Sequence, residues 1–320
     1  MRKIYYFIVL IMLGIIVPGM ITSCSDDGDD NGGKSAPTDK SNINSNLALK
    51  NKNSDVMRLE VPHVRTGKGI YFVSHWAKMK DLATKTVMNY CFEYDSAWCH
   101  SRWVAFTFND TTKVGSGSRS DAWSEDLSLP SACQLLPTSY SGSGYTRGHL
   151  CASADRLFST QANQQTFYMS NMSPQLYNFN SYYWAELELL IRNWSKSSNF
   201  KKLYVCKGGT IKDGQRYPIG EGYFETSNKK GTPVKVAIPR YYFMAILAET
   251  KLGTYQSIGF LLEQHAGYSN NYPAMSQMKQ HVMSIDELEA FTGIDFFCNL
   301  NDNLENQLET DCNVDAWSWN

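Results

Sequence analysis

The sequence predicts an α+β domain, because strand-like segments and helices are grouped along the chain rather than regularly alternated. Segments rich in aromatic and β-branched residues, typical of strands, occur at residues 102–109, 201–210 and 233–249. Helical spacing of apolar residues occurs at residues 181–195 and 284–293. Because no regular β-α-β alternation is visible, the order of the elements favours an α+β domain.

The strand segments differ in how they end. Residues 102–109, "RWVAFTFN", alternate in polarity, and residues 201–210, "KKLYVCKGGT", end at a Gly-Gly turn. Residues 233–249, "PVKVAIPRYYFMAILAE", are predicted to form either two strands or one long strand interrupted at Pro239.

The two helices have clear faces and ends. The helix at residues 181–195 has a stripe of apolar residues that is expected to be buried: Tyr183, Leu187, Leu190, Ile191 and Trp194. The helix at residues 284–293 is expected to begin after Ser284 as N-cap, with Glu287 completing a capping box, and to end at Gly293.

Composition allows one large folded domain. The chain has 320 residues, of which 42% are hydrophobic, and no internal linker or repeat is visible after about residue 56, so one domain is expected over residues 56–320. The 30 Lys and Arg residues nearly balance 31 Asp and Glu residues. Net charge therefore neither favours nor excludes a polyanionic partner, and any basic site must be local.

The N-terminal segment has the character of an export signal. Arg2 and Lys3 precede an apolar run, which is followed by "ITSC" ending at Cys24. This stretch resembles a bacterial lipobox, which implies a signal peptide at residues 1–23 and a lipid attached to Cys24. The alternative is a short transmembrane anchor, but Pro18 and Gly19 interrupt the run before the roughly 20 residues that spanning requires.

Residues 24–55 are polar and poor in aromatic residues, so a flexible tether is expected there. The acidic start, "SDDGDD", resembles the signal that directs some lipoproteins to the outer surface of Gram-negative cells. We therefore expect a bacterial outer-membrane lipoprotein that is exposed on the cell surface or faces the periplasm.

Seven cysteines follow Cys24, and an exported domain meets oxidising conditions in which some could pair. Cys91 and Cys99 are close enough in sequence for a local disulfide, which the sequence alone cannot establish. The odd number leaves at least one cysteine unpaired.

The segment "YTRGHLCASADR", residues 145–156, raises the question of catalysis. A histidine side chain ordinarily titrates near neutral pH, so His149 could act as a general base, while Arg147 nearby offers a planar set of donors for phosphate or carboxylate. The alternative is a polar loop with a structural histidine.

The helix that follows contains polar residues in a related pattern. Glu188 and Arg192 are four residues apart and share a face, and Asn180 lies about two turns earlier. Each has an ordinary alternative, since Asn180 could be an N-cap and Glu188 with Arg192 a surface ion pair.

Together these segments resemble the DNA/RNA non-specific endonucleases of the ββα-metal superfamily, the group that includes endonuclease G. The family pattern is Asp-Arg-Gly-His, then Asn-x-x-Pro-Gln, a further Asn, Trp-x-x-Leu-Glu and an Arg. This chain has Thr146-Arg147-Gly148-His149, Asn171-Met172-Ser173-Pro174-Gln175, Asn180, Trp184-Ala185-Glu186-Leu187-Glu188 and Arg192. The similarity also covers residues 93–108, 118–130 and 291–297, and so most of residues 90–300.

The resemblance implies a ββα-metal (His-Me finger) fold, with a central antiparallel sheet flanked by helices, and metal-dependent hydrolysis of DNA or RNA with little sequence preference. It implies that His149 is the general base and that Asn180 holds Mg²⁺, with Mn²⁺ as a substitute. It further implies that Glu188 orients water on the metal and that Asn171 supports the histidine or that water. The phosphate-binding arginines would be Arg119, Arg147 and Arg192.

One residue departs from the family pattern, because Thr146 stands where the family usually has Asp. If that Asp orients its neighbours, the change could slow the enzyme or alter its metal preference. An alternative function is therefore a catalytically weakened surface lipoprotein that binds nucleic acid. The presence of His149, Asn180 and Glu188 together favours the enzyme, since a binding protein needs neither a base nor a metal ligand.

Overall fold

The computed structural model describes residues 42–80, 84–113, 115, 117–211 and 220–319. The predicted signal peptide, Cys24 and residues 24–41 of the predicted tether lie outside this part of the chain. Among the described residues, no helix has the length and apolar character needed to cross a membrane.

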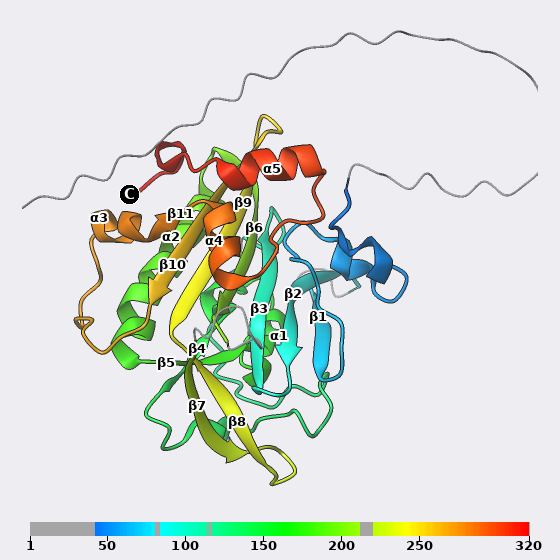
Figure 1. Ribbon diagram of the computed structural model, residues 1–320, viewed down its shortest axis with the longest axis vertical. Coiled ribbons are helices and arrows are strands. Elements are labelled where there is room, and N and C mark those ends of the chain that lie inside the picture. Colours follow the sequence, from blue (N-terminus) through cyan, green and yellow to red (C-terminus); the bar gives the residue numbers. More distant parts are fainter. Residues whose placement is uncertain (1–41, 81–83, 114, 116, 212–219, 320) are drawn as a thin grey trace, which may run out of the picture. The chain divides into compact units, whose positions relative to one another are not determined.

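A seven-stranded antiparallel sheet forms the centre of the fold, in the order β1-β2-β3-β6-β9-β10-β11 (Figure 1). Two further strand pairs, β4-β5 and β7-β8, stand outside it. The strands are β1 (Ile70–Lys78), β2 (Thr86–Asp95), β3 (His100–Phe108), β4 (Thr146–His149), β5 (Met172–Gln175), β6 (Phe200–Gly209), β7 (Gly220–Ser227), β8 (Pro233–Pro239), β9 (Tyr241–Thr250), β10 (Tyr255–Glu263) and β11 (Val282–Met283). All three predicted strand segments are confirmed, and Pro239 ends β8 so that β9 can enter the central sheet.

The α-helices are α1 (Thr160–Gln165), α2 (Ala185–Lys196), α3 (Met275–Met278), α4 (Ile285–Thr292) and α5 (Asp302–Thr310). The predicted capping box of α4 is confirmed: Ser284 Oγ accepts from the Glu287 amide, and the Glu287 carboxylate accepts from the Ser284 amide. Gly293 ends this helix at φ +65°, a left-handed conformation that glycine adopts without a steric penalty.

The central sheet separates two hydrophobic clusters, because alternate residues of a strand point to opposite faces. In β3, Val104 and Phe106 belong to one cluster, and Trp103 and Ala105 belong to the other. Helix α2 covers the first face with Leu187, Leu190, Ile191 and Trp194. Helices α4 and α5 cover the second face (Figure 1).

The residues that resemble the family motif form a ββα unit on the first face. Strand β4 pairs antiparallel with β5, so that His149 lies opposite Met172 and Arg147 opposite Pro174. After β5 the chain forms a π-helical segment, Phe179–Trp184, that continues directly into α2. The predicted fold class, an α+β ββα-metal fold with a central antiparallel sheet flanked by helices, is thereby confirmed.

The helix predicted at residues 181–195 differs from the expectation at its start. Asn180 lies inside the π-helical segment, whose N-cap position is Asn178, so Asn180 is not the N-cap. Tyr183 is only partly buried and packs at 3.9 Å, ring centre to ring centre, on Tyr268. The wider π turn places Asn180 beside β4 instead of on a solvent-exposed helix end.

The folded part begins earlier than the expected boundary at residue 56. Asn46 is buried, and its Nδ2 donates to the carbonyl oxygens of Val56 and Pro62 while its Oδ1 accepts from the Val64 amide. Residues 42–55 therefore belong to the folded unit, because the Asn46 side chain supplies hydrogen-bond partners to backbone groups of residues 56–64.

The proposed disulfide between Cys91 and Cys99 does not form. Cys91 and Cys99 are free thiols that belong to different hydrophobic clusters. The seven cysteines from Cys91 to Cys312 are all unpaired in this structure.

Candidate active site

A cavity of about 710 Å³ opens beside the ββα unit. Its walls contain five of the seven residues predicted for the site: Arg119, Arg147, His149, Asn180 and Glu188. The other two, Asn171 and Arg192, do not line it. The chain thus brings together in space residues that span about 70 positions of the sequence.

His149 ends β4 with its imidazole between two aromatic rings, at centroid distances of 5.4 Å to Trp123 and 4.9 Å to Phe167. Its Nε2 is buried and has no hydrogen-bond partner among the described residues. Burial, together with the positive charges of Arg119, Lys207 and Arg147, lowers the pKa of His149 to about 3. The imidazole is therefore neutral at pH 7 and has a nitrogen able to accept a proton.

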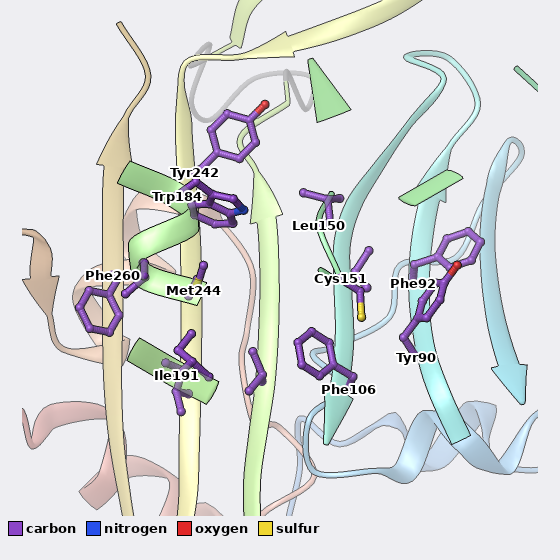
Figure 2. Close-up of a cluster of buried hydrophobic side chains, with 14 of the residues drawn as sticks. Tyr90, Phe92, Phe106, Leu150, Cys151, Trp184, Ile191, Tyr242, Met244 and Phe260 are labelled. Carbon is purple, nitrogen blue, oxygen red and sulfur yellow. The ribbon is translucent and has the colours of Figure 1, made fainter. Parts of the chain in front are cut away.

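The core fixes the backbone at His149. Leu150 and Cys151, the next two residues, are fully buried in the cluster that also contains Phe106 (Figure 2). Trp184 belongs to the same cluster, and its Nε1 donates to the His149 carbonyl oxygen at 3.3 Å. Strand β4 and the start of α2 are thus held in one arrangement.

Asn171 acts on the backbone and not in the cavity. Its fully buried carboxamide accepts from the Cys151 amide and donates to the carbonyl oxygens of Cys151 and Thr166. The expectation that it supports the histidine fits this arrangement, through the loop that follows His149. Asn171 itself does not line the cavity.

Gly148 is required by close packing inside the β4-β5 pair. A Cβ atom at this position would overlap the side-chain carboxamide of Gln175. Only glycine leaves room for Gln175, which is fully buried beneath the strand.

Thr146 fixes the orientation of Asn180. The Asn180 Nδ2 donates to Thr146 Oγ1 at 3.0 Å, and Thr146 Oγ1 donates to the Gln175 carbonyl oxygen at 2.8 Å. Because Nδ2 is engaged, Oδ1 is the carboxamide atom left for a ligand in the cavity. Thr146 stands where the family usually has aspartate, and its hydroxyl can thus hold Asn180 in place.

Two arginines present positive charge to the cavity over aromatic rings. The Arg147 guanidinium lies 3.9 Å from the centroid of the Trp123 ring, and that of Arg119 lies 4.7 Å from Phe167. Arg147 forms no ion pair within the described part of the chain, and Arg119 pairs with Asp121 in an exposed contact. Both guanidinium groups can therefore contact an anion, and Trp123 is a site residue that the sequence did not indicate.

Arg192, predicted to bind phosphate, does not line the main cavity with Arg119 and Arg147. Its Nη1 contacts Asp155 Oδ1 at 2.8 Å, and it lines a neighbouring pocket of about 420 Å³. Asp155 is also 3.4 Å from the Nζ of Lys207, whose Nζ lies 3.1 Å from Glu188 Oε1. The charge of Arg192 is balanced inside the protein, because it is nearest to a buried carboxylate.

The same contacts add Asp155 and Lys207 to the residues around the site. Burial alone would raise the pKa of Asp155, but Lys207 and Arg192 hold it below its usual value. Asp155 belongs to the segment that drew attention in the sequence, whereas Lys207 is marked only by being a lysine within an apolar strand segment. Their contacts with each other and with Glu188 and Arg192 of α2 join three segments that are far apart in the sequence, and no local sequence signal marks them.

Carboxylates that could hold a cation by themselves also occur, but far from His149. Asp286, Glu289, Asp295, Glu305 and Glu309 form two overlapping groups on and around α4 and α5, on the opposite face of the sheet. Burial raises the pKa of Glu289 to about 9, with Glu309 as a further cause. This acidic group is separate from the cavity.

A histidine, a carboxamide, a carboxylate and two arginines around one cavity, all supported by a ββα unit, define the class of ββα-metal phosphodiester hydrolases. The family model of the DNA/RNA non-specific endonucleases matches residues 75–303. The chain therefore belongs to this family, whose members are metal-dependent nucleases, and it is a hydrolase that acts on nucleic acid.

Individual relatives agree with this assignment. A nuclease of Nostoc sp. (strain PCC 7120) is 31% identical over 224 residues, which cover 69% of this chain and 75% of that protein. The mitochondrial nuclease EXOG of Xenopus laevis is 28% identical over 238 residues, or 72% of this chain and 62% of its own length. A chain of the solved EndoG/EndoGI complex has a TM-score of 0.53 at 21% identity, covering 72% of this chain and 88% of that chain, and shares the fold.

Proposed function

We propose that this cavity is the active site for Mg²⁺-dependent cleavage of phosphodiester bonds in DNA and RNA, with His149 as general base. The observation that carries the proposal is the placement of an unpartnered imidazole nitrogen and an oriented asparagine carboxamide in one arginine-lined cavity. Cleavage of an oligonucleotide of mixed sequence and of its RNA counterpart tests it. A ladder of products supports little sequence preference, whereas a single cut site would contradict it.

His149 would take the proton from the attacking water. The nearby positive charges and burial disfavour the imidazolium, so the neutral ring is available across the neutral pH range. Trp123 and Phe167 hold the ring by contact and shield it from other partners.

The residues present fit a Mg²⁺ ion. Asn180 would hold it through Oδ1, the atom left when Thr146 engages Nδ2, and Glu188 would accept hydrogen bonds from water in the cavity. Mg²⁺ suits a site with few protein oxygens because it usually keeps several waters and binds substrate phosphate, and Mn²⁺ takes similar ligands. When bound, the ion supplies Lewis acidity that stabilises negative charge on phosphate and on the leaving oxygen.

Arg147 and Arg119 would bind phosphate oxygens of the substrate. Every nucleotide carries a phosphate, so a site that contacts the backbone through guanidinium groups gives little base preference. Because the net charge of the whole chain is close to zero, the attraction for a polyanionic substrate would come from these local arginines and not from the overall charge.

Removing the Thr146 hydroxyl should weaken metal binding. We expect Thr146→Val to lower Mg²⁺ affinity about three- to ten-fold, because Asn180 Nδ2 and the Gln175 carbonyl oxygen each lose a hydrogen-bond partner. Isothermal titration in a His149→Ala background measures this without turnover. Thr146→Ser keeps the hydroxyl and should bind Mg²⁺ as the parent does, so equal affinities for all three proteins would refute the role of Thr146.

The low pKa of His149 predicts a flat acid limb. Since burial and the neighbouring cations lower that pKa to about 3, His149 stays unprotonated from pH 7 to pH 5, and kcat/KM should change less than about three-fold over that range. If His149 had the ordinary histidine pKa, its neutral fraction at pH 5 would be only about one thirtieth, and kcat/KM would fall by about the same factor. Initial rates below KM in buffers of constant ionic strength distinguish the two.

We also propose that the enzyme is a lipoprotein of the bacterial outer membrane, attached through Cys24 and exposed on the cell surface or facing the periplasm. The supporting observations are the sequence before Cys24 and the polar, acidic segment after it. Labelling of cells with a radioactive fatty acid should mark the protein, and Cys24→Ala should abolish the label. Equal labelling of both proteins would contradict the proposal.

A further inference from the structure

We propose that Lys207 is a positioning residue for this site: its buried ammonium holds the Glu188 carboxylate in place at the cavity wall. The inference rests on the proposed function, because it assigns Glu188 a part in the reaction. Lys207 lies near the end of β6, in the middle of the central sheet, on the face that carries α2. Its side chain is 1% exposed, and its Nζ is 3.1 Å from Glu188 Oε1.

The surroundings of Lys207 leave it few other anions. Its Nζ lies 5.4 Å from the Phe106 ring and 5.8 Å from the Trp184 ring, and its second carboxylate contact is Asp155 at 3.4 Å. Lys207 points to the same face as Leu203 and Val205, which belong to the hydrophobic cluster under α2. The ammonium thus contacts two carboxylates within a mostly apolar layer.

Stability alone is a weak reason for such a lysine. Removing an ammonium from water costs free energy that its ion pairs only partly return, and apolar side chains of similar volume often replace buried ion pairs without loss of stability. Methionine has nearly the length of lysine and could fill this space beside Phe106 and Trp184. A lysine retained here therefore indicates a task at the residue that it contacts.

Asp155 and Arg192 direct the ammonium toward Glu188. Asp155 is 2% exposed, with Oδ1 on Arg192 and Oδ2 on Lys207, so contacts on both oxygens fix its carboxylate. Two cations and two carboxylates balance in charge across this group. Glu188 is the only one of the four that lines the main cavity. The Lys207 charge also contributes to the low pKa of His149, but burial is the largest cause and remains without it, so we expect the group to act on the reaction mainly through Glu188.

The charge of Lys207 also favours the ionised form of Glu188. Burial raises the pKa of Glu188, and the Lys207 ammonium works in the opposite direction. A charged carboxylate accepts hydrogen bonds from water on both oxygens, whereas a protonated one has a donor in place of one acceptor site. Without the ammonium, both the direction and the charge of the carboxylate would be less well defined.

A double-mutant cycle tests the proposal on the full-length protein, with plasmid nicking and thermal unfolding as readouts. We expect Lys207→Met to lower kcat about ten- to a hundred-fold and to leave the KM for DNA within about two-fold. In a Glu188→Gln background the same substitution should change kcat less than about two-fold, because its effect passes through Glu188. The matched control is Lys202→Met, which should keep wild-type kcat, because Lys202 is a half-exposed lysine of the same strand that pairs with Glu249.

The outcomes separate the inference from the proposed function. An equal loss of kcat from Lys207→Met in both backgrounds would show that Lys207 does not act through Glu188 and would overturn the inference. Full activity of Glu188→Gln alone would instead contradict the part that the proposed function gives to Glu188. If Lys207→Met does not fold, Lys207→Met with Asp155→Asn removes one cation and one anion together. The kcat of this double variant is then compared with and without Glu188→Gln. If the two losses of kcat are additive, the inference is overturned there as well.

Discussion

His149→Ala should lower the rate of plasmid nicking by about a hundred- to ten-thousand-fold, the range typical of a lost general base. The substitution removes the unpartnered Nε2 from the cavity and leaves the Asn180 carboxamide and the arginines in place. Binding of DNA should therefore persist within a few-fold. Single-turnover nicking rates and fluorescence anisotropy with a labelled duplex measure the two properties separately.

The control for this substitution is His265→Ala. His265 is exposed and stacks on Tyr268 outside the cavity, so its loss should leave nicking within about two-fold. Thermal unfolding of both variants checks that the His149 variant keeps its fold after losing the contacts with Trp123 and Phe167. A folded His149→Ala protein with wild-type activity would show that this imidazole is not the base.

Asn180→Ala should lower activity at limiting Mg²⁺ about a hundred-fold or more, because the cavity loses the oxygen assigned to the ion. The loss should shrink as Mg²⁺ rises if substrate phosphate and water can still bind the ion. Nicking rates as a function of Mg²⁺ concentration give the apparent affinity directly.

Asn178→Ala is the matched control for this residue. Asn178 lies two positions earlier, donates to the Tyr268 carbonyl oxygen and does not line the cavity. It should show an unchanged Mg²⁺ dependence. A curve for Asn180→Ala that coincides with that of Asn178→Ala would place the metal elsewhere.

The sequence predicted the main features of the fold because local patterns determine them. Helix α4 follows from a capping box and a terminal glycine, and the break at Pro239 follows from a residue that cannot donate to the sheet. The early start of the folded unit was not predictable, since Asn46 looks like a linker residue. Its role depends on backbone groups of Val56, Pro62 and Val64 that only the folded chain presents to it.

In the site, too, residues marked by a local pattern were predictable, whereas residues that depend on contacts made by folding were not. Two segments with a family pattern identified His149, Asn180 and Glu188, and the fold places all three on one cavity. The position of Arg192 could not be predicted, because it depends on Asp155 turning inward from a different segment. Helical spacing gives the face on which Glu188 and Arg192 lie, but it does not identify Lys207, which contacts Glu188 from the sheet below.

Thr146 illustrates how a departure from a family pattern can preserve an arrangement. The sequence alone left it uncertain whether losing the usual aspartate weakens the enzyme. The hydroxyl accepts from Asn180 and donates to the Gln175 carbonyl oxygen, so one short side chain links β4, β5 and Asn180. Thr146 thus keeps Asn180 in contact with β4.

The most direct test of the central claim is digestion of closed circular plasmid by the purified protein, with Mg²⁺ and with EDTA. We predict progressive nicking and linearisation in Mg²⁺, no change in EDTA, and recovery when Mg²⁺ is added back in excess. Plasmid that stays intact with Mg²⁺ and with Mn²⁺, together with intact RNA, in the presence of protein shown to be folded, would contradict the claim.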